Sequence, residues 1–84
     1  MKVIITPKAI KQYDRLPKLA QEKIKKKIAL LENDKLAGKK LSGDFSELRS
    51  LKAWPYRIIY FINEEQETLF VTSIIHRQGA YKHN

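Results

Sequence analysis

Residues 56–77, YRIIYFINEEQETLFVTSIIHR, hold the pattern that decides the fold. Two runs rich in β-branched and aromatic residues, 56–62 and 68–77, flank the acidic segment 63–67. Such runs are typical of β-strands, and a short polar segment between them is typical of a hairpin loop. Both runs are apolar on both of their faces, which predicts central strands that are covered on both sides.

The chain upstream of this hairpin predicts one more strand of the same sheet. Residues 47–52 read as a short strand, and Ala53, Trp54 and Pro55 form the turn that follows it. The proline disfavours a helical conformation at Trp54 and keeps that residue extended. The stretch 36–46 is rich in Gly, Lys and Ser, and we expect it to be a long surface connection.

The first part of the chain predicts a short strand and two helices. Residues 3–5 are β-branched, and Thr6 and Pro7 then supply a capping hydroxyl and a proline at the first helical position. The first helix is expected over residues 7–15, and Pro17 separates it from a second one. The second helix carries an apolar stripe with spacings of four, four and three residues, at Ala20, Ile24, Ile28 and Leu31.

These elements predict an α+β fold with two layers. The order is β-α-α-β-β-β, with an N-terminal strand and a helical hairpin packed on an antiparallel sheet, because the later strands follow each other through short turns. The helical stripe needs an apolar surface, and the sheet is the only one that the chain offers. Eighty-four residues without an internal repeat or a linker predict a single domain over residues 1–84.

The charge is strongly positive and lies mostly in the first half of the chain. The formal net charge is +8, and residues 1–42 hold twelve Lys and Arg against four Asp and Glu, whereas residues 43–84 hold five of each. Such a field attracts polyanions, which include nucleic acid, an anionic membrane surface and an acidic protein. Charge alone does not choose among the three.

Several classes of protein are excluded by what the sequence lacks. There is no cysteine, which excludes a disulfide scaffold and a cysteine-based zinc site. The two histidines have no paired carboxylate nearby, so no metal site is expected. The apolar runs are too short for the core of a signal peptide or for a membrane span. We therefore expect a soluble cytoplasmic protein.

Several phrases of the sequence resemble the RelE/ParE superfamily of toxins. One is the strand Tyr56-Arg57-Ile58-Ile59-Tyr60, and another is the strand end Ile75-His76-Arg77 with Tyr81 a few residues later. The connection Lys40-Leu41-Ser42-Gly43 with Glu47-Leu48-Arg49 is similar to the family's K-L-x-G and L-x-x-L-R segments, and Leu16-Pro17 stands between two helices as in that family. The likeness covers nearly the whole chain, in the element order derived above.

This resemblance implies a toxin of a type II toxin–antitoxin system. The implied activity is a ribosome-dependent endoribonuclease that cuts messenger RNA through attack of a 2′-hydroxyl on its own phosphate, without a metal or another cofactor. An acidic antitoxin protein is the implied partner, and it would cover the basic and apolar surfaces. Two alternatives remain open at this point: a ParE-like poison of DNA gyrase, and a non-catalytic member of the fold that binds nucleic acid or protein.

Two arginines are the candidates for stabilising charge on the reacting phosphate. The planar guanidinium pairs with two phosphate oxygens and stays charged, so it suits this task but does not serve as a base. Arg57 lies near the start of one central strand and Arg77 at the end of its neighbour. Counting from the loop places Arg57 opposite Ser73, and Arg77 about 10 Å or more from it. The alternative for Arg57 is an ion pair with Glu47 or Asp44.

Tyr81 and His83 are the candidates for moving protons. The Tyr81 phenol can transfer a proton if its pKa falls from about 10, or it can stack on a base. The alternative is an aromatic lid on the core. His83 titrates near neutrality, but it stands one residue from the end of the chain, where a frayed tail is the default. His76 is interpreted as a histidine of the core or of an edge rather than a catalytic one.

Further residues are candidates for binding RNA. Lys52 and Arg49 are expected to flank the arginines on the neighbouring strand, Trp54 either stacks on a base or packs over the hairpin, and Lys82 lies in the tail. Some family nucleases carry extra lysines where this chain has Leu48 and Ser50. On the second helix the candidates for phosphate contact, with a solvated helix face as the alternative, are Lys23, Lys26 and Lys27.

Overall fold

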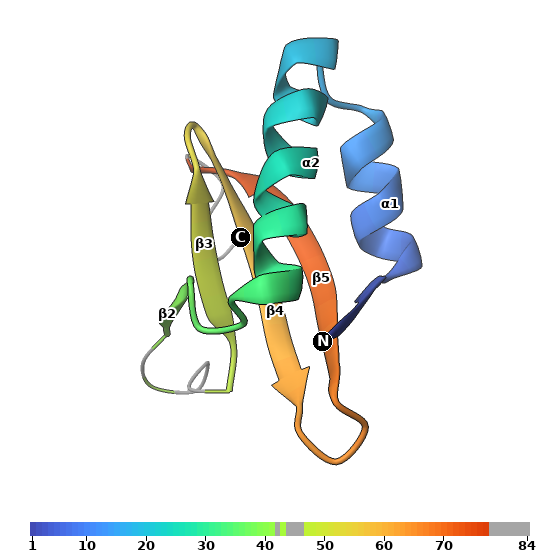
Figure 1. The fold of residues 1–84 in the computed structure, drawn as a ribbon. Coiled ribbons are helices and arrows are strands. Elements are labelled where there is room, and N and C mark those ends of the chain that lie inside the picture. The colour runs from blue at the N-terminus through green and yellow to red at the C-terminus, as the bar shows by residue number, and fades with distance from the viewer. Residues whose placement is uncertain (42, 44–46, 78–84) are drawn as a thin grey trace.

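The computed structural model of the chain describes residues 1–41, 43 and 47–77. Two helices and one sheet form two layers (Figure 1), which confirms the α+β prediction. No helix in these residues is long and apolar enough to cross a membrane. The elements are β1 (Lys2–Ile5), α1 (Pro7–Asp14), α2 (Lys18–Asn33), β2 (Lys39–Lys40), β3 (Arg49–Ala53), β4 (Tyr56–Asn63) and β5 (Thr68–His76).

The five strands lie in the order β1-β5-β4-β3-β2, so the β4–β5 hairpin is central as predicted. The prediction of an antiparallel sheet is wrong at one edge, where β1 pairs with β5 in parallel. The chain passes through both helices after β1, so no turn in the sequence fixes the direction of that strand. The surface connection expected over 36–46 contains β2, whose two lysines pair with Arg49 and Ser50 of β3. A pair of lysines carries no strand pattern.

Both helices begin where the sequence predicts. The Thr6 side chain accepts a hydrogen bond from the Ala9 backbone N–H at 3.3 Å, and Pro7 occupies the first turn of α1. This helix ends at Asp14, one residue earlier than expected, because Arg15 is its C-terminal cap. Of the apolar stripe on α2, Ile24 and Leu31 are fully buried.

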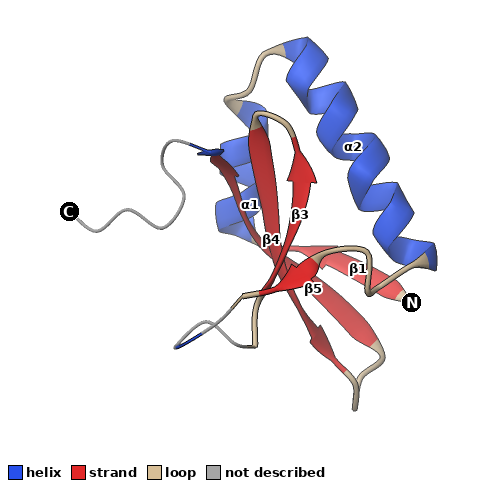
Figure 2. Ribbon diagram, turned by 90° about the vertical axis from the view of Figure 1, so that its left-hand side faces the viewer, coloured by secondary structure: helices blue, strands red, loops and turns tan. Residues whose placement is uncertain are grey.

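The two helices pack against different parts of the sheet. Helix α2 lies across one face, and α1 lies beside the outer edge of β5, beyond the end of β1 (Figures 1 and 2). Strand β1 covers this edge only as far as Val71. Past that point the Gln12 side chain of α1 accepts a hydrogen bond from the Ile74 N–H at 2.7 Å, and the Thr6 hydroxyl donates to the Thr72 carbonyl at 3.3 Å. These contacts satisfy edge groups of β5 that β1 does not reach.

The register of the central hairpin differs from the predicted one by two residues. Arg57 lies opposite Ile75 rather than Ser73. One residue of the shift comes from the loop, because Asn63 rather than Ile62 pairs with Thr68. The other comes from a bulge between Ile59 and Tyr60, and bulges leave no clear trace in a sequence.

The prediction that the central strands are covered on both faces is confirmed only for the middle of β4, where Ile58, Ile59 and Tyr60 are all buried. Ile58 and Tyr60 pack in the core with α2, so the alternation of a strand directs Arg57, Ile59 and Phe61 to the other face. Figure 2 shows α2 on one side of the sheet, and that is the side toward which Ile58 and Tyr60 point. Phe61 instead stacks on Phe70 of β5, with ring centroids 5.1 Å apart. We call this surface the open face of the sheet.

Candidate nucleic-acid interface

Three cationic side chains come from neighbouring strands at one end of the sheet. Lys52 of β3 lies directly opposite Arg57 of β4, and Arg57 lies opposite Ile75 of β5. Residues that face each other in a sheet point to the same side, so Lys52 and Arg57 share the open face. Arg77 follows two residues after Ile75. The corrected register therefore brings the Cα atoms of Arg57 and Arg77 to about 8 Å from each other, closer than the sequence predicted.

The position of Arg77 is fixed by the turn between β3 and β4. Its backbone N–H donates to the Pro55 carbonyl at 2.8 Å. Its guanidinium lies over the Trp54 ring, 4.7 Å from the ring centroid. The preceding residue, His76, packs edge-on against Tyr56, with ring centroids 5.4 Å apart. His76 is thus an edge histidine held by an aromatic contact, as interpreted from the sequence.

No carboxylate in the described chain neutralises these three cations. Among residues 1–41, 43 and 47–77 the one salt bridge joins Lys35 to Glu64 at 3.1 Å. The alternative ion pair of Arg57 with Glu47 is therefore absent, and Asp44 lies outside the described residues. Like charges directly opposite each other destabilise a sheet. An anion bound between them attracts both and offsets their repulsion. We call Lys52, Arg57 and Arg77 the cation cluster.

Trp54 and Lys23 lie next to the cation cluster. Trp54 is 56% exposed, with Arg77 over its ring. The Lys23 ammonium of α2 donates to the Trp54 carbonyl at 2.8 Å. The turn therefore joins the start of α2 to the same end of the sheet.

The structure places Arg49 away from the cluster. Arg49 lies opposite Tyr60, three residues before Lys52, and so belongs to the other face of β3. Its guanidinium donates to the Gly38 carbonyl at 2.8 Å. The buried Tyr60 hydroxyl donates to the Lys35 carbonyl at 2.8 Å and accepts from the Gly38 N–H at 2.9 Å. Burial of the phenol raises the pKa of Tyr60.

This buried network holds the connection between α2 and β2 against β4. A Cβ atom added at Gly38 would lie 2.7 Å from the Tyr60 ring, so the close approach requires glycine. Arg49 and Tyr60 thus have a structural task. The prediction that Arg49 flanks the reacting phosphate has no support in this geometry.

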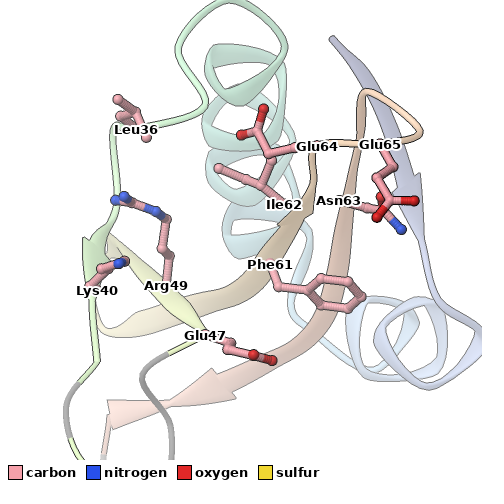
Figure 3. Close-up of a pocket in the computed structure, with 9 residues that line it drawn as sticks. All are labelled: Leu36, Lys40, Glu47, Arg49, Phe61, Ile62, Asn63, Glu64 and Glu65. Carbon is pink, nitrogen blue, oxygen red and sulfur yellow. The ribbon is translucent and has the colours of Figure 1, made fainter.

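The far end of β3 and β4 holds a different surface (Figure 3). An open hollow of about 710 Å³ lies beside Arg49, Lys40 and Phe61. Three carboxylates, those of Glu47, Glu64 and Glu65, also line it. The mixed charge makes this hollow a poor site for a polyanion.

The predicted lysines of α2 do not lie together. Lys23 contacts the turn at Trp54, and Lys27 is half-buried and lines a groove near Lys52 and Arg57. Lys26 is exposed, and because it stands two residues after the buried Ile24 it lies on roughly the opposite side of α2 from the buried stripe. The structure therefore joins Lys23 and Lys27 to the end of the sheet that carries the cluster, and it separates Lys26 from them.

Two cations near the cluster were missed by the sequence reading. Lys39 and Lys40 of β2 line the same groove as Lys27, Lys52 and Arg57, in a volume of about 430 Å³. Residues 36–46 were interpreted as a connection without a strand, so nothing in that reading placed these lysines beside β3. Tyr81, Lys82 and His83 lie outside the described residues, and their predicted roles stay predictions. Those described residues contain no group of three or more His, Cys, Asp or Glu arranged to hold a metal ion.

One family model and several solved structures are similar to this chain. The model of the family described as the ParE toxin of the type II toxin–antitoxin system parDE matches residues 3–81. No curated protein matches the chain. The fold is similar to a chain of the RelBE2 toxin–antitoxin complex from Mycobacterium tuberculosis, with 24% identity, 90% of this chain and 96% of that chain covered, and a TM-score of 0.83.

Two further solved structures share the fold. A YoeB/ParE toxin from Agrobacterium tumefaciens is 23% identical, covers 90% of this chain and 98% of its own, and has a TM-score of 0.78. The isolated E. coli RelE toxin is 24% identical, with 89% of this chain and 82% of that one covered, and a TM-score of 0.75. The family match over nearly the whole length, on a fold that RelE and YoeB/ParE toxins share, shows that this chain belongs to the ParE toxin family of type II toxin–antitoxin systems.

Proposed function

We propose that this toxin is a ribosome-dependent endoribonuclease that cuts messenger RNA at the cation cluster. The observation that carries the proposal is the convergence of Lys52, Arg57 and Arg77 on one end of the sheet with no carboxylate partner in the described chain. Unpaired guanidinium groups from adjoining strands suit the oxygens of one phosphodiester.

The reaction needs charge stabilisation and two proton transfers. The 2′-oxygen attacks the adjacent phosphorus, and the bond from phosphorus to the 5′-oxygen breaks. The products are a 2′,3′-cyclic phosphate and a free 5′-hydroxyl. Arg57 and Arg77 stabilise the negative charge that develops on the phosphoryl oxygens, and Lys52 positions the backbone. A base accepts the proton of the 2′-hydroxyl and an acid supplies one to the 5′-oxygen. Tyr81 and His83 are the proposed groups for these transfers.

The surroundings of the cluster support a nucleic-acid substrate. Trp54 is exposed beside Arg77, and an exposed aromatic ring next to cations is the arrangement on which an unstacked base can lie. Lys23 adds a further positive charge at the same turn. In this proposal the ribosome presents the messenger, and the cytoplasm is where both are found.

An antitoxin is the second proposed partner. Similar structures include RelBE2 from M. tuberculosis and the RelB–RelE complex from Methanococcus jannaschii, which were solved as toxin–antitoxin complexes. A net charge of +8 favours an acidic protein. We propose that such an antitoxin covers the basic end of the sheet and thereby blocks access of RNA.

A second candidate function is poisoning of DNA gyrase. The observation that favours it is the family model itself, which is that of the ParE toxin. In that case the cation cluster would contact a protein or DNA and would cut no RNA.

Controlled expression in a bacterial host separates the two functions. We expect growth arrest with cleaved transcripts for the wild type, and loss of both in an Arg57→Ala variant. Lys2→Ala is the control, because Lys2 is an exposed cation opposite Thr68, and Thr68 lies at the other end of β5 from Ile75, the residue that faces Arg57. Cleavage should stop when translation initiation is blocked beforehand. Growth arrest with intact transcripts and broken DNA would overturn the nuclease and support the gyrase poison.

A further inference from the structure

Every charged residue that lines the groove beside the cation cluster is positive. Its charged lining residues are Lys27 of α2, Lys39 and Lys40 of β2, Lys52 of β3 and Arg57 of β4. These positions come from four different elements of the fold. No carboxylate lines the groove, and in the described chain no salt bridge involves any of the five cations.

The pairing of β2, β3 and β4 determines where the lining cations of these strands lie. Lys39 lies opposite Ser50, and Lys52 stands two residues further along β3, opposite Arg57. Neighbouring strands are about 4.8 Å apart, so β2 and β4 place their cations about 10 Å apart across the sheet. The groove therefore runs from the outer edge of the sheet inward to Arg57.

Ser50 adds an observation that does not depend on charge. Its side chain lines the groove and the residue is 8% exposed. Its hydroxyl oxygen is buried and has no hydrogen-bond partner in the described part of the chain. A buried hydroxyl without a partner is costly, and the Ser50 side chain has to rotate toward the groove before it can donate to an acceptor bound there. A phosphate oxygen is such an acceptor.

We infer that the groove holds the sugar-phosphate backbone of a single RNA strand on its way to the cation cluster. Lys27 and Lys39 bind phosphates that flank the reacting one, and Arg57 is the point where the strand reaches the scissile phosphate. This inference rests on the proposed function, because it takes Arg57 as a ligand of that phosphate. It adds the path of the RNA strand. It also gives Lys39 of β2 a role in RNA binding, although this lysine takes no part in the cleavage reaction.

An RNA strand fits the groove better than an acidic protein segment does. The cations that line the groove include Lys52 and Arg57, where the proposed reaction needs an RNA phosphate. A strand that is bound at Arg57 has to extend past the cluster, and Arg57 itself lines the groove. The apolar lining residues Ala37, Leu41 and Leu51 leave room for lysine stems to pack while the ammonium groups face the ligand.

The test is the salt dependence of binding to an RNA that the toxin cannot cut. The probe is a 2′-O-methyl oligouridine, whose blocked 2′-oxygen prevents cleavage. Each phosphate contact on a single strand contributes about 0.7 to the slope of log affinity against log salt. A Lys27→Gln, Lys39→Gln double variant should therefore lower the slope by about 1.4.

The matched control is a Lys8→Gln, Lys11→Gln double variant. It removes the same charge from exposed positions on α1, and it should leave the slope within about 0.3 of the wild-type value. Equal slopes for the groove variant and the wild type overturn the inference. An equal drop for both variants overturns it as well, because general charge then explains the binding.

The outcome also separates this inference from the nuclease proposal. A wild type that shows the groove-dependent slope and never cuts transcripts supports the groove and refutes the nuclease. A wild type that cuts transcripts while the groove variant keeps the full slope supports the nuclease and refutes the groove. Poly-L-glutamate is the second probe. If the groove variant loses affinity for poly-L-glutamate but none for RNA, the groove takes an acidic protein segment and the inference is wrong.

Discussion

Replacement of Tyr60 by phenylalanine tests the buried network that places β2. The hydroxyl makes two hydrogen bonds, to the Lys35 carbonyl at 2.8 Å and from the Gly38 N–H at 2.9 Å. Tyr60 and Gly38 are buried, so the Gly38 N–H loses its partner without access to water when the hydroxyl is removed, whereas the bond to the Lys35 carbonyl is only partly buried. Each bond contributes about 0.5–1.5 kcal/mol, and a buried group left without a partner costs about 1–3 kcal/mol. We expect Tyr60→Phe to lower the free energy of unfolding by about 2–3 kcal/mol.

The assay is equilibrium unfolding in urea, with thermal unfolding beside it. For a domain of this size 1 kcal/mol corresponds to about 4–8 °C, so Tm should fall by roughly 10–20 °C. Tyr13→Phe is the matched control, because the Tyr13 hydroxyl makes no hydrogen bond with another described residue. A loss below about 0.5 kcal/mol in Tyr60→Phe would refute the network as a source of stability.

The same residue predicts how stability changes at high pH. Burial raises the pKa of Tyr60 in the folded state above its value of 10.0 in the unfolded chain. The protonated phenol therefore contributes stability that is present in full below pH 10. That contribution is lost as the pH rises through the folded-state pKa, because the unfolded chain releases its proton first. Urea midpoints measured above pH 10 should fall more steeply for the wild type than for Tyr60→Phe, and parallel curves would contradict this.

Three further substitutions test contacts that position the site. Gln12→Ala removes the acceptor for the Ile74 N–H at the β5 edge and should cost about 1–2 kcal/mol in urea unfolding, whereas Gln12→Glu keeps the acceptor and should cost less. Thr6→Ala removes the cap of α1 and should cost about 1 kcal/mol by the same assay, and no change would mean that the cap is not formed in solution. A double-mutant cycle of Trp54→Ala and Arg77→Ala should give a coupling energy of about 0.5–1 kcal/mol, and strict additivity would show that the ring does not hold the arginine.

The elements of the fold follow from local patterns in the sequence. The Thr6-Pro7 start of α1, the apolar stripe of α2 and the acidic loop of the hairpin each depend on residues close in the chain, and the structure confirms all three. The direction of β1 and the existence of β2 depend on pairing between distant segments. No local pattern specifies such pairing, so sequence reasoning failed there.

The site could be predicted only in part, because it also depends on pairing between distant segments of the chain. Lys52 and Arg57 come together because the turn between their strands is short, and the sequence shows that turn. The separation of Arg77 from Arg57 was overestimated, since a bulge and the loop pairing shift the register by two residues. The place of Arg49 did have a signal: it stands three residues from Lys52, and an odd spacing in a strand puts two side chains on opposite faces. For Lys39 and Lys40, no pattern in the sequence indicated that they lie beside β3.

The central claim is that guanidinium groups at the rim of the sheet stabilise charge on a phosphodiester of messenger RNA. The most direct measurement is the chemistry of transcript ends after the purified toxin acts on ribosomes programmed with a defined messenger. We predict new 2′,3′-cyclic phosphate and 5′-hydroxyl ends that require the ribosome. Removing one such charge should lower the rate about 100- to 1,000-fold in Arg57→Ala and in Arg77→Ala. A wild type that leaves the messenger intact, or variants that cut at the wild-type rate, would contradict the claim.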